Sequence, residues 1–189
     1  MELKGAGAVK STVLQSGEIL DCDMVVAGIG VTPITEPLLK SGIELKDGVV
    51  VNEYLETSQP HILAAGDVAN YYDVLFEKHR RAEHWDNAVS QGQHCARSLL
   101  GERTPFIHVF YFFSDLFDLS YEFWGDPSGA QELVERGDMS SSSFSVWWLR
   151  QGKLAAAFLM NRSEEERAAA PRLIQSKELT SAKTLTSSA

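Results

Sequence analysis

The segment that decides the fold reads His61-Ile62-Leu63-Ala64-Ala65-Gly66-Asp67-Val68. A short apolar run that ends in a glycine and a carboxylate predicts a strand covered on both faces. Gly66 has no Cβ and lets backbone approach a ligand closely. Asp67 would then lie at the carboxyl end of a strand, where open α/β sheets bind their ligands. The alternative is an ordinary turn, because Gly-Asp is a common turn signal.

Composition narrows the class of protein. The 189 residues suffice for one or two domains with a buried core, and the hydrophobic and charged fractions of 44% and 23% are typical of a globular chain. The formal net charge of −9 argues against partners such as nucleic acid or anionic membrane, which favour basic surfaces. No apolar run approaches the roughly 18 residues of a membrane span.

Cysteine use and the first residues set an expectation for the compartment. Cys22 and Cys95 stand far apart and form neither a CxxC motif nor a metal-ligand spacing. The first five residues contain no apolar stretch of a signal peptide. We therefore expect a cytoplasmic protein with two inert thiols and no metal site.

The first third of the chain has the pattern of a small sheet. Strands are predicted over 6–14, from Ile19 onward and over 23–30, the last one apolar enough to be buried on both faces. Gly28 and Gly30 close this third strand, where they either allow a close ligand approach or form a simple exit turn. A short helix is predicted from Thr35 to Lys40, and a strand over 49–51.

After Asp67, the pattern predicts a loop of about 15 residues, a length that is usually functional or flexible. A helix follows from about Trp85 to Gly101, and its first turn region carries Glu83, His84 and Asp86. Acids there complement the helix dipole, while His84 taken alone is a capping or solvent-facing residue. An apolar stripe along this helix is formed by Trp85, Ala88, Val89, Gly92, Ala96 and Leu99.

The character of the chain changes near residue 103, where an aromatic region begins. Strands are predicted over 119–124, 131–136, 144–150 and 153–160, the last two joined as a hairpin at Gln151-Gly152. Ser163 and Glu166 form a capping box for a final helix that Pro171 should kink or break. The chain from about 176 is expected to be disordered. The aromatic side chains are interpreted as core, or as an oligomer surface: Phe110, Tyr111, Phe112, Phe113, Trp147 and Trp148.

Three stretches taken together resemble a known family. They are VVAGIGVTP at 25–33, ILAAGDV at 62–68 and RAEHWDNA at 81–88. In order and spacing they are similar to the C-terminal part of the FAD-dependent pyridine nucleotide oxidoreductases, the group of ferredoxin reductases, apoptosis-inducing factor and monodehydroascorbate reductase. The stretch YFFSDLFDLSYEFWGD at 111–126 looks most like monodehydroascorbate reductase. The resemblance covers about residues 5–170.

The resemblance implies a fold of α/β plus α+β class, the end of a flavoprotein with two dinucleotide-binding domains. Residues 1–32 would end the NAD(P)-binding domain and residues 33–103 the FAD-binding domain. Residues 104–176 would form a small antiparallel-sheet domain with helices, and 177–189 a disordered tail.

The resemblance also implies site residues for FAD and NAD(P)H. Asp67, with Gly66 and Val68, would bind the ribityl chain of FAD. The helix start at Glu83, His84 and Trp85 would direct backbone amides at the flavin pyrimidine edge. Phe113 matches a position that is usually Trp or Tyr near the flavin, and Gly28 and Gly30 would lie beside the nicotinamide. No general acid or base is expected, because the flavin carries the chemistry.

The implied activity is hydride transfer from NAD(P)H to FAD and then electron transfer to an acceptor. The acceptor would be a ferredoxin-like protein or a small radical or quinone-like molecule. The sequence lacks a GxGxxG motif and therefore the adenosine half of the FAD site. Expected partners thus include a missing N-terminal portion or a homodimer. The alternative is a non-catalytic fragment or assembly module that acts through its aromatic sheet.

Overall fold

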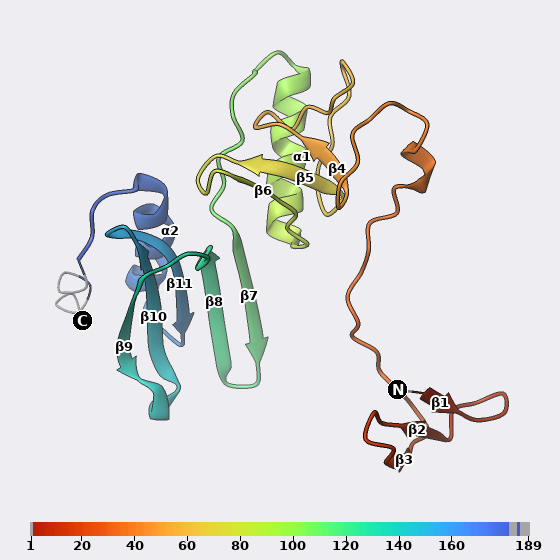
Figure 1. Cartoon of the computed structure of the whole chain (residues 1–189). Coiled ribbons are helices and arrows are strands. Elements are labelled where there is room, and N and C mark those ends of the chain that lie inside the picture. The colour runs from red at the N-terminus through yellow and green to blue at the C-terminus, as the bar shows by residue number, and fades with distance from the viewer. Residues whose placement is uncertain (1, 182–184, 186–189) are drawn as a thin grey trace. The chain divides into compact units, whose positions relative to one another are not determined.

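The computed structural model describes residues 2–181 and 185 (Figure 1). The chain divides between Thr32 and Pro33 into two compact units, which are described separately below. The second unit contains both helices of the described residues and most of the strands.

The first unit is a three-stranded antiparallel sheet in the order β1-β2-β3. Its strands are β1 (Glu2–Lys4), β2 (Ser11–Val13) and β3 (Ile19–Asp21). The strand predicted over 6–14 is therefore present but shorter, and β1 was not predicted. The predicted buried strand over 23–30 is wrong: the segment is irregular, and Met24, Val26 and Ile29 are 78%, 89% and 87% exposed. No strand of residues 2–181 pairs with this segment, and without a ladder an apolar run has no reason to stay extended and covered.

The second unit begins with the short 3-10 helix η1 (Glu36–Leu38) and a small mixed sheet. The sheet order is β4-β5-β6, with β4 (Val49–Val51) parallel to β5 (Ala69–Asp73) and β5 antiparallel to β6 (Lys78–Arg80). The strand predicted over 49–51 is confirmed, and the helix predicted from Thr35 to Lys40 is present as the shorter η1.

Two predictions around Asp67 are wrong. Residues 61–68 form no strand and make a single bridge, between Leu63 and Glu56. The strand is instead β5, which follows directly and lies inside the predicted long loop. The loop prediction failed because β5 carries polar residues in buried positions: Asn70 and Asp73 are 7% and 2% exposed. Asp73 accepts hydrogen bonds from the backbone N–H of Leu75 and Phe76, so its polarity serves the turn to β6.

Helix α1 (Trp85–Leu99) confirms the predicted helix, but its buried face is not the apolar stripe. The buried residues are Asn87, Gln91 and His94, whereas Trp85 and Leu99 are 78% and 71% exposed. A polar face turned inward requires hydrogen-bond partners, and the site described below supplies one of them. The small core next to α1 is formed by Val49, Val51, Leu55, Ala69, Tyr71, Ala82 and Phe106.

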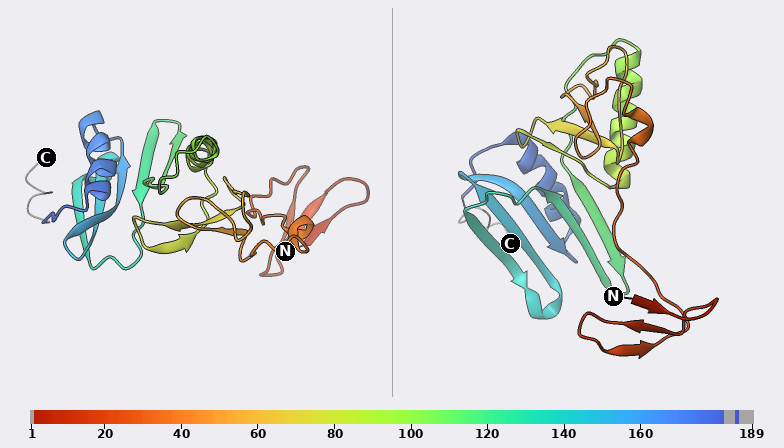
Figure 2. Two further views of the ribbon diagram at one scale, coloured as in Figure 1. Left: turned by 90° about the horizontal axis from the view of Figure 1, so that it is seen from above. Right: turned by 45° about the vertical axis from the view of Figure 1, so that its right-hand side comes forward.

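The largest element is a five-stranded antiparallel sheet in the order β7-β8-β11-β10-β9 (Figures 1 and 2). Its strands are β7 (Tyr111–Leu116), β8 (Leu119–Gly125), β9 (Glu132–Asp138), β10 (Ser143–Arg150) and β11 (Lys153–Met160), with the short 3-10 helix η2 (Met139–Ser141) before β10. The predicted strands and the β10–β11 hairpin are confirmed. Trp147 is 1% exposed and therefore belongs to the core.

Helix α2 (Glu164–Ser176) covers one face of this sheet, as Figure 2 shows. Ser163 is its N-cap and accepts from the Glu166 N–H, as predicted. The Glu166 carboxylate does not return to the cap. It is buried, pairs with Arg136 and Arg162, and accepts from the Ser145 hydroxyl. The helix continues through Pro171 to Ser176 and is not broken there. Ala170 and Ile174 join Trp147, Leu149 and Leu159 in the core.

The predicted disordered tail, 177–189, lies only partly within the described residues. There the structure differs from that expectation: Leu179 makes a bridge with Lys153, and the Thr180 N–H donates to the Gly152 carbonyl at 2.7 Å. Leu185 is buried in the core of the large sheet. Residues 182–184 and 186–189 lie outside the described part of the chain.

Candidate functional site

The Gly66 turn rests on helix α1. The Gly66 N–H donates to Gln91 Oε1 at 2.7 Å, and a Cβ placed on Gly66 would lie 3.6 Å from the Ala88 Cβ. Gly66 has a φ of +80°, a conformation that glycine adopts without strain. The glycine thus serves the turn and its close approach to α1, and Gln91 is one of the residues that give the helix its polar buried face.

Asp67 is fixed through its backbone and leaves its side chain free. The Asp67 carbonyl accepts from Arg81 Nη1 at 2.8 Å, and Arg81 also pairs with Asp47 and Glu83. The Asp67 side chain is exposed, and within residues 2–181 its carboxylate has no hydrogen-bond or ion-pair partner. Next to it, the Val68 carbonyl accepts from the Val49 N–H at 2.8 Å, so Val68 anchors the turn to β4. A carboxylate held this way is available to accept hydrogen bonds from hydroxyl groups.

The N-terminus of α1 presents unused backbone donors. Its N-cap, His84, has extended φ and ψ of −135° and 141° and makes no side-chain cap. The first helical hydrogen bond runs from the Ala88 N–H to the His84 carbonyl at 3.0 Å. The N–H groups of Trp85, Asp86 and Asn87 therefore have no acceptor among the described residues. Such donors, aligned with the helix dipole, favour a negatively charged group.

Strand β7 and the segment before it hold this helix start. The His84 ring stacks on Phe112, with ring centroids 5.0 Å apart and planes 9° apart, and meets Phe110 edge-on at 5.2 Å. His108 Nε2 lies 2.6 Å from Asp86 Oδ2. The first turn of α1 is therefore fixed by aromatic and polar contacts, while Glu83 and Trp85 stay exposed.

Three further predicted residues, Phe113, Gly28 and Gly30, are described by their own surroundings. Phe113 is 59% exposed and stacks on Tyr111 at 5.9 Å; it points to the opposite face of β7 from Phe112. Gly28 and Gly30 belong to the first unit, in irregular and exposed backbone. A Cβ at either glycine would meet no atom within 4 Å, although Gly30 has a φ of +78°.

Two residues of the site were missed by sequence reasoning, Gln91 and Arg81. Gln91 is fully buried and looked like a solvent-facing polar residue between apolar positions. Arg81 ends a charged run, Glu77 to Arg81, which closes the predicted long loop. Gln91 and Arg81 each hydrogen-bond to a backbone group of another segment. Neither helical periodicity nor a charge pattern in the sequence can predict such a contact.

No group of three or more His, Cys, Asp or Glu side chains in the described residues is placed to hold a metal ion. Cys22 and Cys95 are unpaired thiols, and burial raises the pKa of Cys95. In the same part of the chain, neither α-helix has the length and apolar character needed to cross a bilayer.

Three features of this unit indicate a class of protein: a turn with a free carboxylate before β5, a helix start with open amides, and an antiparallel C-terminal sheet. Residues 1–92 match the family model "Pyridine nucleotide-disulphide oxidoreductase", and residues 111–189 match "Reductase C-terminal". Both parts of the chain thus resemble the pyridine nucleotide-disulphide oxidoreductases, a family of FAD-dependent enzymes that use NAD(P)H. The predicted family and cofactor classes are thereby confirmed.

Relatives and solved structures agree with this assignment. The chain is 32% identical over 167 residues to a monodehydroascorbate reductase of Solanum lycopersicum, covering 85% of this chain and 39% of the relative. It is 31% identical to a putidaredoxin reductase of Pseudomonas putida, covering 83% of this chain and 37% of the relative.

Among solved structures, a ferredoxin reductase of Rhodopseudomonas palustris has a TM-score of 0.82 at 31% identity, covering 98% of this chain and 48% of that one. The covalent putidaredoxin reductase–putidaredoxin complex has a TM-score of 0.87 at 28% identity, covering 94% and 42%. The predicted fold class is confirmed. This chain spans less than half the length of these relatives.

The residues present fit the riboflavin half of FAD. The Asp67 carboxylate is unpartnered, the amides at the start of α1 are open, and a ligand near Gly66 would meet no side chain at that residue. Hydroxyl groups and an electron-rich ring edge are the chemical groups that such donors and acceptors match.

Proposed function

We propose that this chain forms part of an FAD-dependent NAD(P)H oxidoreductase that passes electrons to an acceptor. The observation that carries the proposal is the pairing of a fixed turn and a free carboxylate at Gly66-Asp67 with the open amides of α1, joined by the Gly66–Gln91 hydrogen bond. FAD, when bound, accepts a hydride from NAD(P)H and supplies the redox chemistry.

In this proposal, the residues of this chain bind the flavin and orient it. The Asp67 carboxylate would accept hydrogen bonds from the ribityl hydroxyls of FAD. Gly66 and Val68 would hold the backbone of the turn in place beside the ribityl chain. The amides of Trp85, Asp86 and Asn87 would stabilise negative charge on the pyrimidine edge of the ring. The side chains of Glu83 and Trp85 would border this edge, and His84 would position it through its stacking on Phe112.

The further assignments rest on the family resemblance. We propose that Phe113 packs near the flavin and that Gly28 and Gly30 approach the nicotinamide in the assembled enzyme. Residues 1–32 would end the NAD(P)-binding domain, residues 33–103 the FAD-binding domain, and residues 104–176 would form the C-terminal domain. Polypeptide beyond these 189 residues, in the same chain or in a partner, would supply the adenosine half of the site. The acceptor would be a ferredoxin-like protein, as in the complex named for a relative, or a small radical or quinone-like molecule.

Flavin binding by the full-length protein tests this proposal. The purified protein should absorb near 450 nm, roughly where bound flavin does, and should reduce ferricyanide with NADH or NADPH. A colourless protein without turnover, whose only property is self-association, would support the non-catalytic assembly module instead.

Asp67→Asn provides the residue-level test. It should weaken FAD binding about tenfold, because a charge-assisted hydrogen bond is lost, while the unfolding midpoint of the apoprotein stays unchanged. The matched control is Glu102→Gln, another exposed acid in this unit. Equal FAD affinity in wild type and Asp67→Asn, measured by fluorescence titration, would contradict the role of Asp67.

A further inference from the structure

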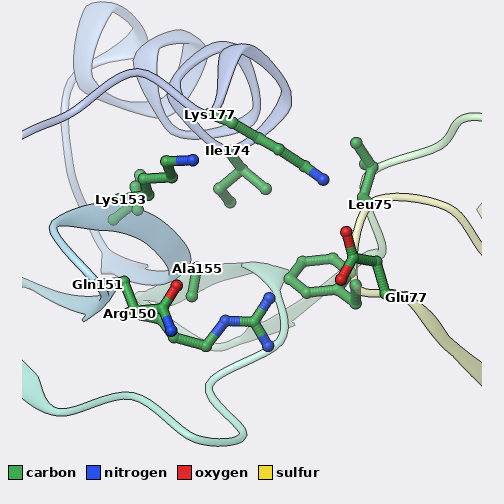
Figure 3. A pocket seen from close by; sticks show the side chains of 10 residues that line it. Leu75, Glu77, Arg150, Gln151, Lys153, Ala155, Ile174 and Lys177 are labelled. Atoms are coloured by element: carbon green, nitrogen blue, oxygen red, sulfur yellow. The ribbon is translucent and has the colours of Figure 1, made fainter.

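A polar cavity lies away from the residues proposed to bind flavin, between three segments of the second unit (Figure 3). It has a volume of about 130 Å³. Its lining comes from the β5–β6 turn, the β10–β11 hairpin and the end of α2: Leu75, Phe76 and Glu77; Arg150, Gln151, Lys153, Leu154 and Ala155; and Ile174 and Lys177. None of these residues belongs to the site described above.

The cavity gathers positive charge in an acidic protein. Figure 3 shows the side chains of Arg150, Lys153 and Lys177 around the opening, with Glu77 across from Lys153. Three cations and one carboxylate leave a local excess of positive charge, although the whole chain carries −9. Confined charges of one sign attract a counter-ion.

The three cations have no carboxylate partner within the part of the chain that the structure describes. Among residues 2–181 and 185, no ion pair within 4.0 Å involves Arg150, Lys153 or Lys177. The lack of an ion pair is not general in this unit. Six other arginines do form one: Arg80, Arg81, Arg103, Arg136, Arg162 and Arg167.

The backbone that carries these cations is held in place. The Gln151 N–H donates to Gln131 Oε1 at 2.9 Å, which fixes the hairpin turn. The Lys153–Leu179 bridge and the hydrogen bond from the Thr180 N–H to the Gly152 carbonyl tie the segment after Lys177 to the same turn. The two lysines are therefore kept at one cavity by backbone contacts, and ligand binding need not assemble the site.

Arg150 is positioned by an aromatic ring. Its guanidinium carbon lies 5.9 Å from the Phe76 ring centroid, within the range of a cation–π contact. This contact orients the guanidinium and leaves its N–H groups able to donate to an anion, for which the planar fork is well suited.

The size of the cavity limits the ligand to a few atoms. Pockets for nucleotides or drug-sized molecules measure roughly 300–1,000 Å³, well above this volume. We propose that this cavity binds a small multiply charged oxyanion of the phosphate class, held by Arg150, Lys153 and Lys177. The source is either free phosphate or the phosphoryl group of a larger molecule.

Calorimetric titration of the 189-residue chain tests the proposal. Inorganic phosphate and phosphoserine are titrated separately, against sodium chloride of equal ionic strength to remove general screening. The double variant Lys153→Gln/Lys177→Gln should bind phosphate at least about tenfold more weakly, since two charge-assisted contacts are lost. The matched control is Lys40→Gln/Lys46→Gln, which removes the same charge from exposed positions of the same unit.

The outcomes are distinct. Binding in wild type and control, with loss in the double variant, supports the site, and the tighter of the two ligands identifies its source. If neither phosphate nor phosphoserine binds, or if the wild type, the double variant and the control bind equally well, the proposed site is overturned. Unfolding midpoints in chloride confirm that the double variant is folded. Because the titration needs no flavin, its result is independent of the proposed oxidoreductase activity.

Discussion

At the scale of single residues, Gln91 is the least expected contributor to the candidate site. It is fully buried, and its Oε1 accepts from the Gly66 N–H, while its Nε2 has no partner among the described residues. The Gln91 side chain thus fixes the position of the Gly66 turn on α1. A polar side chain is needed here because the Gly66 N–H requires an acceptor.

Replacing this glutamine should destabilise the second unit. Gln91→Leu leaves the Gly66 N–H without its acceptor, and we expect the free energy of unfolding to fall by about 1–3 kcal/mol in urea titrations. The matched control Gln93→Leu changes an exposed position of the same helix and should have little effect. An unchanged stability in Gln91→Leu would mean that water replaces the lost hydrogen bond without cost.

The residue types around Gly66 and Asp67 left two interpretations open, a ligand-binding strand end and an ordinary turn. The ligand role came from the family resemblance and stays a proposal, while the local structure differs from the predicted strand. The predicted strand over 61–68 failed because a strand needs a neighbour, and the described residues provide one bridge at Leu63. The buried glutamine could not be predicted, since periodicity classifies a polar side chain as exposed.

At the scale of elements, Asp126 joins the β5–β6 hairpin to the segment that follows β8. Its carboxylate lies 2.5 Å from Lys78 Nζ and 3.5 Å from Arg80 Nη1, and its residue is 5% exposed. Burial alone would raise the pKa of Asp126, but hydrogen bonds from Lys78 and Ser128 outweigh it and hold the pKa at about 2.

Because this pKa is lowered in the folded state, the free energy of unfolding depends on pH in the acidic range. The stabilisation is present above the unfolded-state pKa of about 3.9 and is lost as the pH falls through about 2. Asp126→Asn should lower stability at neutral pH and flatten the loss of stability between these two pH values, as urea titrations at several pH values can measure. The exposed Asp115→Asn serves as control. An identical pH dependence in Asp126→Asn and wild type would exclude Asp126 as the source.

Elements were predictable where their pattern is local. The strands β8 to β11 and the β10–β11 hairpin followed from alternation and from the Gln151-Gly152 turn. By contrast, β5 was missed because its polar residues are buried: Asn70 donates to the carbonyl of the distant Lys46, and Asp73 accepts from the turn that follows the strand. The inward polar face of α1 escaped prediction for the same reason.

At the scale of the whole molecule, a large amount of apolar side chain is exposed. Met24, Val26 and Ile29 are 78%, 89% and 87% exposed, and Trp85 and Leu99 on α1 are 78% and 71% exposed. Soluble monomers seldom leave such residues uncovered in number. The chain spans about two fifths of its curated relatives, and we propose that further polypeptide covers these surfaces in the assembled enzyme.

Self-association of the 189-residue chain should therefore depend on these side chains. The double variant Val26→Lys/Ile29→Lys should reduce the sedimentation coefficient and the binding of a hydrophobic dye, because charge replaces exposed apolar surface. The control Gln15→Lys/Gln175→Lys adds the same charge at exposed polar positions. Equal sedimentation of both variants would attribute any change to net charge alone.

The parallel pairing of β4 with β5 has a consequence for the order of folding. The β7–β8 and β10–β11 hairpins pair residues close in sequence, whereas Val50 must find Asn70 across the whole of segment 52–68. Contacts between distant residues form slowly, since the intervening chain loses entropy before they are made. Segment 52–68 contains Gly66 and Asp67, so this turn would form after the two hairpins. During that interval the chain would already hold the β7–β8 and β10–β11 hairpins beside an unformed Gly66 turn, and a ligand that binds only the formed turn, as FAD is proposed to do, would favour its completion.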